Sequence, residues 1–162
     1  MKTKNIVSII LIVFVVVAAV LIIKNNLKNS GVEKVAEAKE TSKKVESLPI
    51  KDGIIVYYFH TTRRCQSCMK AERLARETVE KFFQEQLDSK KIVFLPINTD
   101  EPENRHYIED YKLFSKSLIL SMVRDGKEVK SKNLTEIWQL IYNDEGFYNY
   151  VKAEIESYLK EL

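Results

Sequence analysis

The pattern of apolar and polar positions divides the chain into a uniformly apolar start, a polar stretch and a mixed remainder. Residues 6–23 (IVSIILIVFVVVAAVLII) contain no charge and only Ser8 as a polar group. As a helix rising ~1.5 Å per residue they would reach ~27 Å, which is close to the hydrocarbon thickness of a bilayer. Residues 24–52 are rich in Lys, Glu, Ser and Asn and lack aromatic residues, a composition typical of a solvated tether. We therefore expect a transmembrane anchor over residues 1–23, a polar tether over 24–52 and one domain over 53–162.

An uncleaved anchor fits the start of the chain better than a cleaved signal peptide. Lys2 and Lys4 form a basic n-region, but the apolar core of a signal peptide normally spans only ~7 to 15 residues. No small-residue cleavage site follows the apolar run directly. Lys24 and Lys28 balance the lysines on the other flank, so charge gives little information on orientation. By default we expect a single-pass protein of the cytoplasmic membrane with its C-terminal domain on the extracytoplasmic side.

The first part of the domain predicts a strand, a helix and a second strand. Residues 54–59 are an unbroken β-branched and aromatic run, as in a strand buried on both faces. A polar loop over residues 60–64 then leads to a helix over residues 66–87, where apolar positions recur at three- and four-residue steps. Residues 92–98 predict a second strand, and Pro96 within it suggests a strand end, an edge position or a bulge.

The second part predicts a hairpin framed by helices. Asp125-Gly126 lies between the strand-like runs 117–123 and 128–130, which is a strong hairpin signal. Before the hairpin, His106, Tyr107, Asp110 and Tyr111 could share one helical face. After it, the pattern predicts a helix over 133–142, a break over 143–146 and a last helix over 147–162.

The charge of the chain argues against one class of partner. The formal net charge is +3, but most of it lies before the domain, since residues 24–52 alone carry seven lysines against five acids. With Lys2 and Lys4 also set aside, the domain over 53–162 has a charge of about −1. A near-neutral domain lacks the basic footprint of a nucleic-acid binder, so we expect no nucleic-acid partner.

The two cysteines of the chain, Cys65 and Cys68, stand in a C-x-x-C spacing at the start of the first predicted helix. A bridge between residues so close in sequence closes too small a loop to be the main staple of a fold. Redox or metal chemistry is therefore favoured over architecture. A metal site would need His60 or the remote His106 as further ligands, and these positions form no recognisable ligand spacing, so we expect no metal.

The order of elements, with the C-x-x-C pair opening the first helix, resembles the thioredoxin fold over roughly residues 53–162. Residues 58–68 (YFHTTRRCQSC) resemble small bacterial and archaeal thioredoxin-like proteins more than thioredoxin itself. The resemblance implies an α/β domain with a central mixed sheet flanked by helices. It also implies that Cys65 is the exposed attacking thiol and Cys68 the resolving thiol. A redox-active disulfide would then replace any other cofactor, and the partners would be protein thiols or disulfides and a redox partner protein.

The sequence departs from the thioredoxin pattern at several positions. Arg64 takes the place of the aromatic residue before the first cysteine, and Gln66-Ser67 replaces Gly-Pro between the cysteines. The buried acid of the first strand is missing from residues 54–58. The stretch around Ser117, which matches the substrate-gripping cis-proline loop, holds no proline. A non-proline cis bond costs ~2.5 to 4 kcal/mol, so we expect a trans bond there and a different contact with substrate, in which Ser117 is a candidate.

The residues before the helix bear on whether the cysteines react. The thiolate is the nucleophile, and a free cysteine with a pKa of ~8.5 is mostly protonated at neutral pH. A helix N-terminus and the positive charges of Arg63 and Arg64 would stabilise an anion at Cys65, and His60 would shape the loop. We therefore expect a lowered pKa for Cys65. The alternative is a redox-silent thioredoxin-like binding module tethered at the membrane, and the direction of electron flow stays open.

Overall fold

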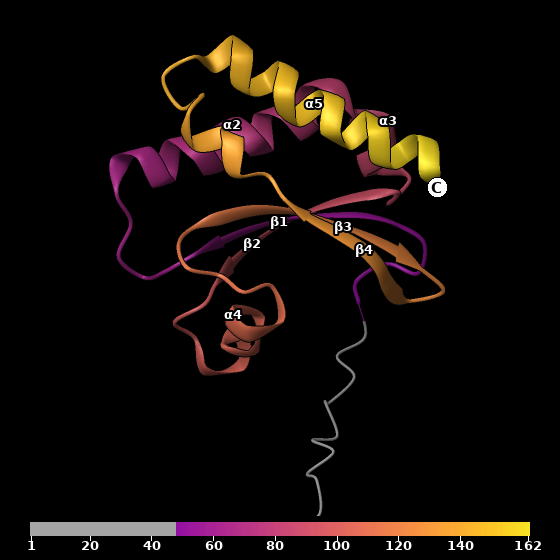
Figure 1. Cartoon of the computed structure of the whole chain (residues 1–162). Coiled ribbons are helices and arrows are strands. Elements are labelled where there is room, and N and C mark those ends of the chain that lie inside the picture. The colour runs from indigo at the N-terminus through magenta and orange to yellow at the C-terminus, as the bar shows by residue number, and fades with distance from the viewer. Residues whose placement is uncertain (1–47) are drawn as a thin grey trace, which may run out of the picture. The chain divides into compact units, whose positions relative to one another are not determined.

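Four strands form one mixed sheet in residues 48–162, the part of the chain that this computed structural model describes (Figure 1). The predicted membrane anchor and all but the last five residues of the predicted tether lie outside the described residues. Within residues 48–162, no helix has both the length and the apolar character needed to cross a membrane.

The sheet has the strand order β2-β1-β3-β4. β1 (Gly53–His60) pairs in parallel with β2 (Ile92–Asn98), in register from Ile54 opposite Ile92. On its other side β1 pairs with the antiparallel β3 (Ser117–Arg124), so that Phe59 lies opposite Ser117. The two strands predicted first are confirmed, and β2 is an edge strand, where the missing N–H of its proline is tolerated.

The predicted hairpin is also confirmed. β3 and β4 (Lys127–Asn133) are joined by the two residues Asp125 and Gly126, whose φ angles are 51° and 72°. Two positive φ angles define the tight turn that matches the twist of antiparallel strands, and glycine adopts them without steric cost. β3 is buried at every position but its last, whereas every residue of β4 is exposed. The sheet therefore ends in a polar strand.

Helices cover the two faces of the sheet unequally (Figure 1). α2 (Gln66–Phe82), α3 (Gln84–Asp88) and α5 (Asp144–Glu161) lie over one face, and the short α4 (His106–Asp110) lies over the other. The prediction of one helix over 66–87 is wrong at Phe83, where the backbone leaves the helical region and the ring is 3% exposed. Burial of this aromatic ring against the core accompanies the change of direction that separates α2 from α3.

The prediction for the start of the C-terminal region is wrong. Instead of a helix over 133–142, the chain forms a single 3₁₀ turn, η2 (Thr135–Trp138). Leu134, Ile137 and Ile141 are buried there, so the apolar spacing that suggested a helix reflects three anchors of an irregular connection. The predicted break at 143–146 is the first turn of α5, because the Asn143 side chain caps the helix by accepting a hydrogen bond from the Gly146 N–H at 3.0 Å.

Two apolar clusters fill the space on the two faces of the sheet. The larger lies under α2 and α5 and includes Val56 and Tyr58 of β1, Leu74 of α2 and Val151 of α5. The smaller lies on the face of α4, where Tyr57 and Phe59 contact the rings of Tyr107 and Tyr111. Because successive β1 side chains point to opposite faces, this buried strand is the centre of both clusters.

The last residues of the predicted tether pack on the folded domain. Leu48 and Ile50 belong to the smaller cluster, and Ile50 is 7% exposed. The Lys51 carbonyl accepts a 2.8 Å hydrogen bond from the N–H of Gly126, and the Asp52 carboxylate accepts one of 3.0 Å from the N–H of Asp125. These contacts join the chain before β1 to the tip of the hairpin.

The arrangement is a thioredoxin-like fold. A β1-α2-β2 unit supplies the parallel pair, and an antiparallel hairpin followed by α5 completes a four-stranded mixed sheet flanked by helices. The C-x-x-C pair lies at the start of α2, after the loop that follows β1, as the resemblance implied.

Candidate functional site

Three loops meet at the edge of the sheet where β1 ends. His60, the last residue of β1, lies opposite Asn98, the last residue of β2, and Phe59 lies opposite Ser117, the first residue of β3. The loops over residues 61–65, 99–101 and 111–116 therefore start or end side by side. The cysteines belong to the first of these loops and to the helix that it opens.

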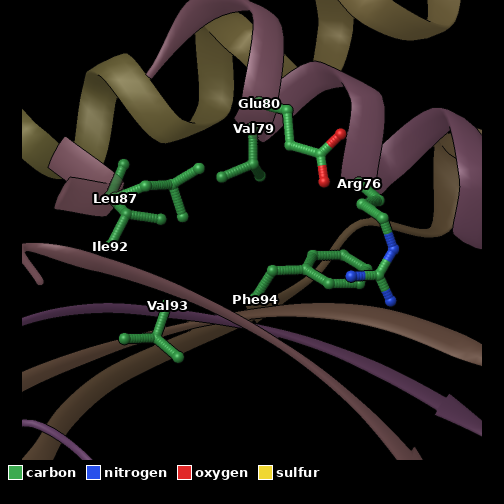
Figure 2. A pocket seen from close by; sticks show the side chains of 7 residues that line it. All are labelled: Arg76, Val79, Glu80, Leu87, Ile92, Val93 and Phe94. Carbon is green, nitrogen blue, oxygen red and sulfur yellow. The ribbon is translucent and has the colours of Figure 1, made fainter. Parts of the chain in front are cut away.

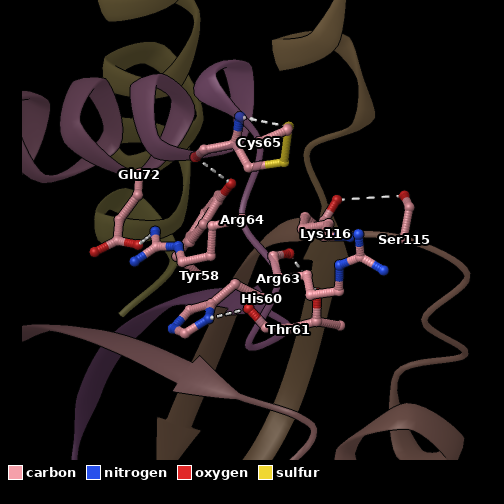
Figure 3. The surroundings of a disulfide bond; sticks show 10 residues. Tyr58, His60, Thr61, Arg63, Arg64, Cys65, Glu72, Ser115 and Lys116 are labelled. Atoms are coloured by element: carbon pink, nitrogen blue, oxygen red, sulfur yellow. Dashed lines mark hydrogen bonds and ion pairs between the residues drawn. A yellow bond between two sulfur atoms is a disulfide. The ribbon is translucent and has the colours of Figure 1, made fainter.

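Cys65 and Cys68 are joined by a disulfide, with 5.0 Å between their Cα atoms (Figure 3). The two residues differ in accessibility, since Cys65 is exposed and Cys68 is 4% exposed. Only Cys65 is therefore open to a large reaction partner. The roles of Cys65 as the attacking thiol and Cys68 as the resolving thiol stay predictions.

The sulfur of Cys65 caps α2. Cys65 has an extended backbone, and its Sγ accepts a hydrogen bond of 3.1 Å from the N–H of Cys68. The first turn of α2 contains no acidic residue. A thiolate at this position would therefore receive a backbone N–H and the positive end of the helix dipole, both of which stabilise an anion.

Tyr58 lies beneath the disulfide and ties it to the sheet. Its side chain is fully buried, and its hydroxyl donates a 2.6 Å hydrogen bond to the backbone carbonyl of Cys68. Burial raises the pKa of the Tyr58 phenol well above its ordinary value, so the group stays a neutral donor. The alternation along β1 predicts a buried side chain at this position, but not its bond to Cys68, which is ten residues away.

The two arginines before Cys65 have different surroundings. The guanidinium of Arg64 forms an ion pair with the carboxylate of Glu72, and Figure 3 shows Arg64 beside Tyr58, directed at Glu72. Arg63 forms no ion pair with any residue of the described part. Of the two positive charges predicted to act on Cys65, one is therefore already engaged by a carboxylate. Sequence spacing gave no reason to single out Glu72 except that it follows Cys68 by one helical turn.

The cysteine loop is fastened to the loop after β2. The N–H of Thr62 donates a 2.8 Å hydrogen bond to the carboxylate of Asp100, and the N–H of Thr99 donates one of 2.8 Å to the carbonyl of His60. The hydrogen bonds from Thr62 lower the pKa of the Asp100 carboxyl, with further help from the positive charges of Lys116 and Arg105. Asp100 was missed as a site residue by the sequence, because its partner stands 38 positions earlier.

His60 and Ser117 are in contact with the backbone of neighbouring residues. The His60 Nδ1 lies 3.1 Å from the carbonyl of Thr61, which fits a proton on that nitrogen. Ser117 is 5% exposed, and its hydroxyl donates a 3.0 Å hydrogen bond to the carbonyl of Ser115. No peptide bond in residues 48–162 is cis, so the loop before Ser117 has trans geometry. Contact of Ser117 with a substrate stays a prediction.

The histidines named as possible metal ligands do not form a ligand cluster with the cysteines in the described residues. His106 lies on α4, where its Nδ1 is 2.9 Å from the carboxylate of Asp110. Among residues 48–162, no group of three or more His, Cys, Asp or Glu side chains is arranged to hold a metal ion.

Two of the hollows on the surface of the domain differ in their lining residues. One of about 260 Å³ is lined by residues of α2, α3 and β2, among which Arg76 lies beside Phe94 (Figure 2). The other, of about 150 Å³, adjoins the site loops and is lined by His60, Thr61 and residues 113–116, among others. Phe114 at this second hollow is 98% exposed. The exposed ring and Thr61, which belongs to the loop that leads to Cys65, therefore line the same hollow.

Comparison with known proteins gives similarities of fold only. No protein-family model matches the chain, and no curated protein matches it. Among solved structures, the germline-specific thioredoxin Deadhead of Drosophila melanogaster is 27% identical, with a TM-score of 0.35 over 50% of this chain and 68% of the other. A thioredoxin of Entamoeba histolytica is 18% identical, with a TM-score of 0.38 over 63% and 82% of the two chains. Chloroplastic thioredoxin z is 15% identical, with a TM-score of 0.37 over 71% and 97%.

The chain is thus similar to thioredoxins in the order of its elements and in the C-x-x-C pair at the start of its first described helix.

Proposed function

We propose that this chain is a thiol-disulfide oxidoreductase that exchanges disulfides with protein thiols through Cys65 and Cys68. The observation that carries the proposal is the disulfide itself, with one sulfur exposed at a helix N-terminus and the other buried behind it. An accessible sulfur is needed for attack by a partner, and a protected second sulfur completes the exchange without a competing partner.

The exchange runs in two balanced steps. A substrate thiolate attacks the Sγ of Cys65, the bond to Cys68 breaks, and Cys68 leaves as a thiolate that takes up a proton. A second substrate thiolate then attacks the substrate sulfur of the mixed disulfide, which forms the substrate disulfide and releases Cys65 as a thiolate. The substrate has lost two electrons and the protein has gained them. The same steps in reverse reduce a substrate disulfide, so the relative reduction potentials set the direction.

The substrate would meet the surface around Cys65. Arg63 offers a positive charge with no ion-pair partner in the described residues, and Lys116 borders the hollow beside Phe114. These groups suit a protein segment with an apolar side chain near its cysteine. After each turnover a redox partner protein would return the cysteine pair to its starting redox state by exchange at the accessible sulfur of Cys65.

The proposed place of action is the outer side of the cytoplasmic membrane. The support is the uncharged run over residues 6–23, which has the length of a membrane-spanning helix. Alkaline extraction of membranes tests this part separately. Full-length protein that stays with the membrane pellet fits an anchor, whereas release into the supernatant contradicts it.

A glutathione redox titration of the full chain in detergent tests the catalytic proposal. We expect one reversible two-electron transition, and exchange with a reduced, two-cysteine protein substrate that Cys65→Ser abolishes. The measured potential would give the direction of electron flow. A pair that cannot be reduced and reoxidised, or exchange that survives Cys65→Ser, would overturn the proposal and favour the binding module.

A further inference from the structure

Glu72 stands at the centre of a row of charges that runs from the cysteine loop along α2. One carboxylate oxygen pairs with Arg64, and the other lies 3.6 Å from the guanidinium of Arg76. Arg76 in turn lies over the ring of Phe94, 4.7 Å from its centroid, and both residues line the hollow of about 260 Å³ (Figure 2). The carboxylate is thus shared by two arginines, of which only Arg64 adjoins Cys65.

Helix geometry places this carboxylate near the resolving cysteine. Glu72 follows Cys68 by four residues, so the two side chains lie on the same face of α2, one turn apart. The Glu72 side chain is 15% exposed, and Arg64 is 28% exposed. Burial is the main reason for the raised pKa of Tyr58, but the charge of Arg64 lowers it and that of Glu72 raises it, so both charges act just beneath the disulfide.

Among the charged side chains near the site, Arg64 is the one whose charge next to Cys65 is balanced by a carboxylate. Lys70 pairs with Asp144 of α5 at 2.8 Å, and Asp100 accepts the Thr62 N–H. Arg63 has no ion pair within the described residues, and Lys116 acts on Asp100 from the third loop. Only the charge of Arg64 is both adjacent in sequence to Cys65 and bound to a carboxylate.

We infer that Glu72 is a positioning residue of the proposed exchange reaction, which by pairing with Arg64 limits how far Arg64 stabilises the Cys65 thiolate. The inference rests on the proposed function, since a thiolate matters only if the pair is reduced and reoxidised. Glu72 offsets part of the positive charge before Cys65, so the reduced form is less stable than it would be without Glu72. Glu72 therefore shifts the protein toward a weaker oxidant.

Paired substitutions separate this role from a structural one. In a Cys68→Ser background of the full chain, pH-dependent alkylation measures the pKa of Cys65 alone. We expect Glu72→Gln to lower this pKa by about half a unit, the effect of one charge at roughly 10 Å in a medium of dielectric constant about 50. Arg64→Gln should raise the pKa, and the double variant should return close to the starting value, because both members of a neutral pair are then gone.

A control and a second route keep the test decisive. Glu80→Gln removes the same charge from an exposed position two turns farther along α2, and it should leave the pKa of Cys65 unchanged. Should Glu72→Gln not fold, Arg76→Gln frees Glu72 from its second arginine and should raise the pKa of Cys65. The inference is overturned if Glu72→Gln leaves that pKa unchanged or raises it, or if Arg76→Gln lowers it or leaves it unchanged.

The reduction potential gives an independent readout in the protein with both cysteines. Glu72→Gln should make the potential more oxidising than that of the unsubstituted chain. Alkylation reports the thiolate whether or not the protein exchanges disulfides with other proteins. If Glu72→Gln shifts the pKa of Cys65 but the protein exchanges no disulfides, only the proposed function is contradicted. If the protein exchanges disulfides but this pKa does not shift, only the role of Glu72 is contradicted.

Discussion

The buried hydroxyl of Tyr58 is bound to the backbone carbonyl of Cys68 at 2.6 Å, so the central strand holds the first turn of α2 directly. Tyr58→Phe removes this hydrogen bond and keeps the ring. We expect the free energy of unfolding to fall by about 1 kcal/mol, the usual net value of one buried hydrogen bond. Urea unfolding of the full chain measures the change. Tyr142→Phe is the matched control, because that ring is 86% exposed and should give no change.

The unequal exposure of the two sulfurs predicts which substitution traps a partner. Cys68→Ser leaves the exposed Cys65 to form a mixed disulfide that nothing resolves, whereas Cys65→Ser leaves only a thiol that is 4% exposed. Incubation with a disulfide-containing protein, followed by non-reducing electrophoresis, should show a trapped adduct with Cys68→Ser only. Adducts of equal amount with both variants would contradict the assignment of roles.

The exposed ring of Phe114 separates substrate contact from stability. Phe114→Ser should leave the unfolding free energy within about 0.5 kcal/mol of its starting value, as is usual for a surface position. It should also lower kcat/KM several-fold for a protein substrate, because an apolar contact worth about 1 kcal/mol corresponds to roughly a fivefold change. The rate with glutathione, which is too small to span this surface, should not change. An equal loss for both substrates would argue against a contact role.

The lowered pKa of Asp100 predicts a pH-dependent contribution to stability. The folded pKa lies below the ordinary value of about 3.9, so the contribution is complete above that pH and is lost as pH falls through the folded pKa. Comparison of the full chain with Asp100→Asn by urea unfolding should therefore show a constant deficit between pH 5 and pH 7 that shrinks below pH 4. A deficit that is independent of pH would mean that the charge of Asp100 plays no part.

Two glycines with positive φ should respond differently to alanine. Gly126 has φ of 72° and open space around it, so Gly126→Ala should cost only about 1 kcal/mol of backbone strain. A Cβ at Gly53 would lie 2.3 Å from the carbonyl oxygen of Lys91, a backbone atom that cannot move aside without disturbing β1 and β2. Thermal unfolding should therefore show a clearly larger loss for Gly53→Ala. Equal losses would contradict this steric argument.

Local patterns were sufficient for the strands and the hairpin. Residues 54–59 and 92–98 have compositions that suit a buried strand and its edge neighbour, and Asp125-Gly126 marks the hairpin through its position between two strand-like runs. Helix limits were harder to predict, because apolar spacing does not show whether a segment can change direction. Phe83 interrupts the predicted helix where its ring reaches the core, and the segment before α5 uses its apolar residues as single anchors.

The candidate site was only partly predictable for a related reason. The C-x-x-C spacing identifies the two cysteines, and the elements on either side predict that they lie at the N-terminus of α2. The contacts of Tyr58, Glu72 and Asp100 connect positions between 8 and 38 residues apart, and only the packing of α2 on the sheet and the pairing of β1 with β2 bring these partners together. Arg64 is an example: the sequence predicts that its charge stabilises a thiolate at Cys65, but in the structure this charge is paired with Glu72.

The polar outer strand has a consequence for how copies of this protein behave when they are crowded. Within residues 48–162, β4 pairs only with β3, and every one of its residues is exposed. An additional strand docking there would have to align beside Lys127 and beside Lys130 and Lys132, which form ion pairs with Glu161 and Glu154 of α5. Charged side chains along an exposed edge discourage growth of the sheet from one molecule into the next.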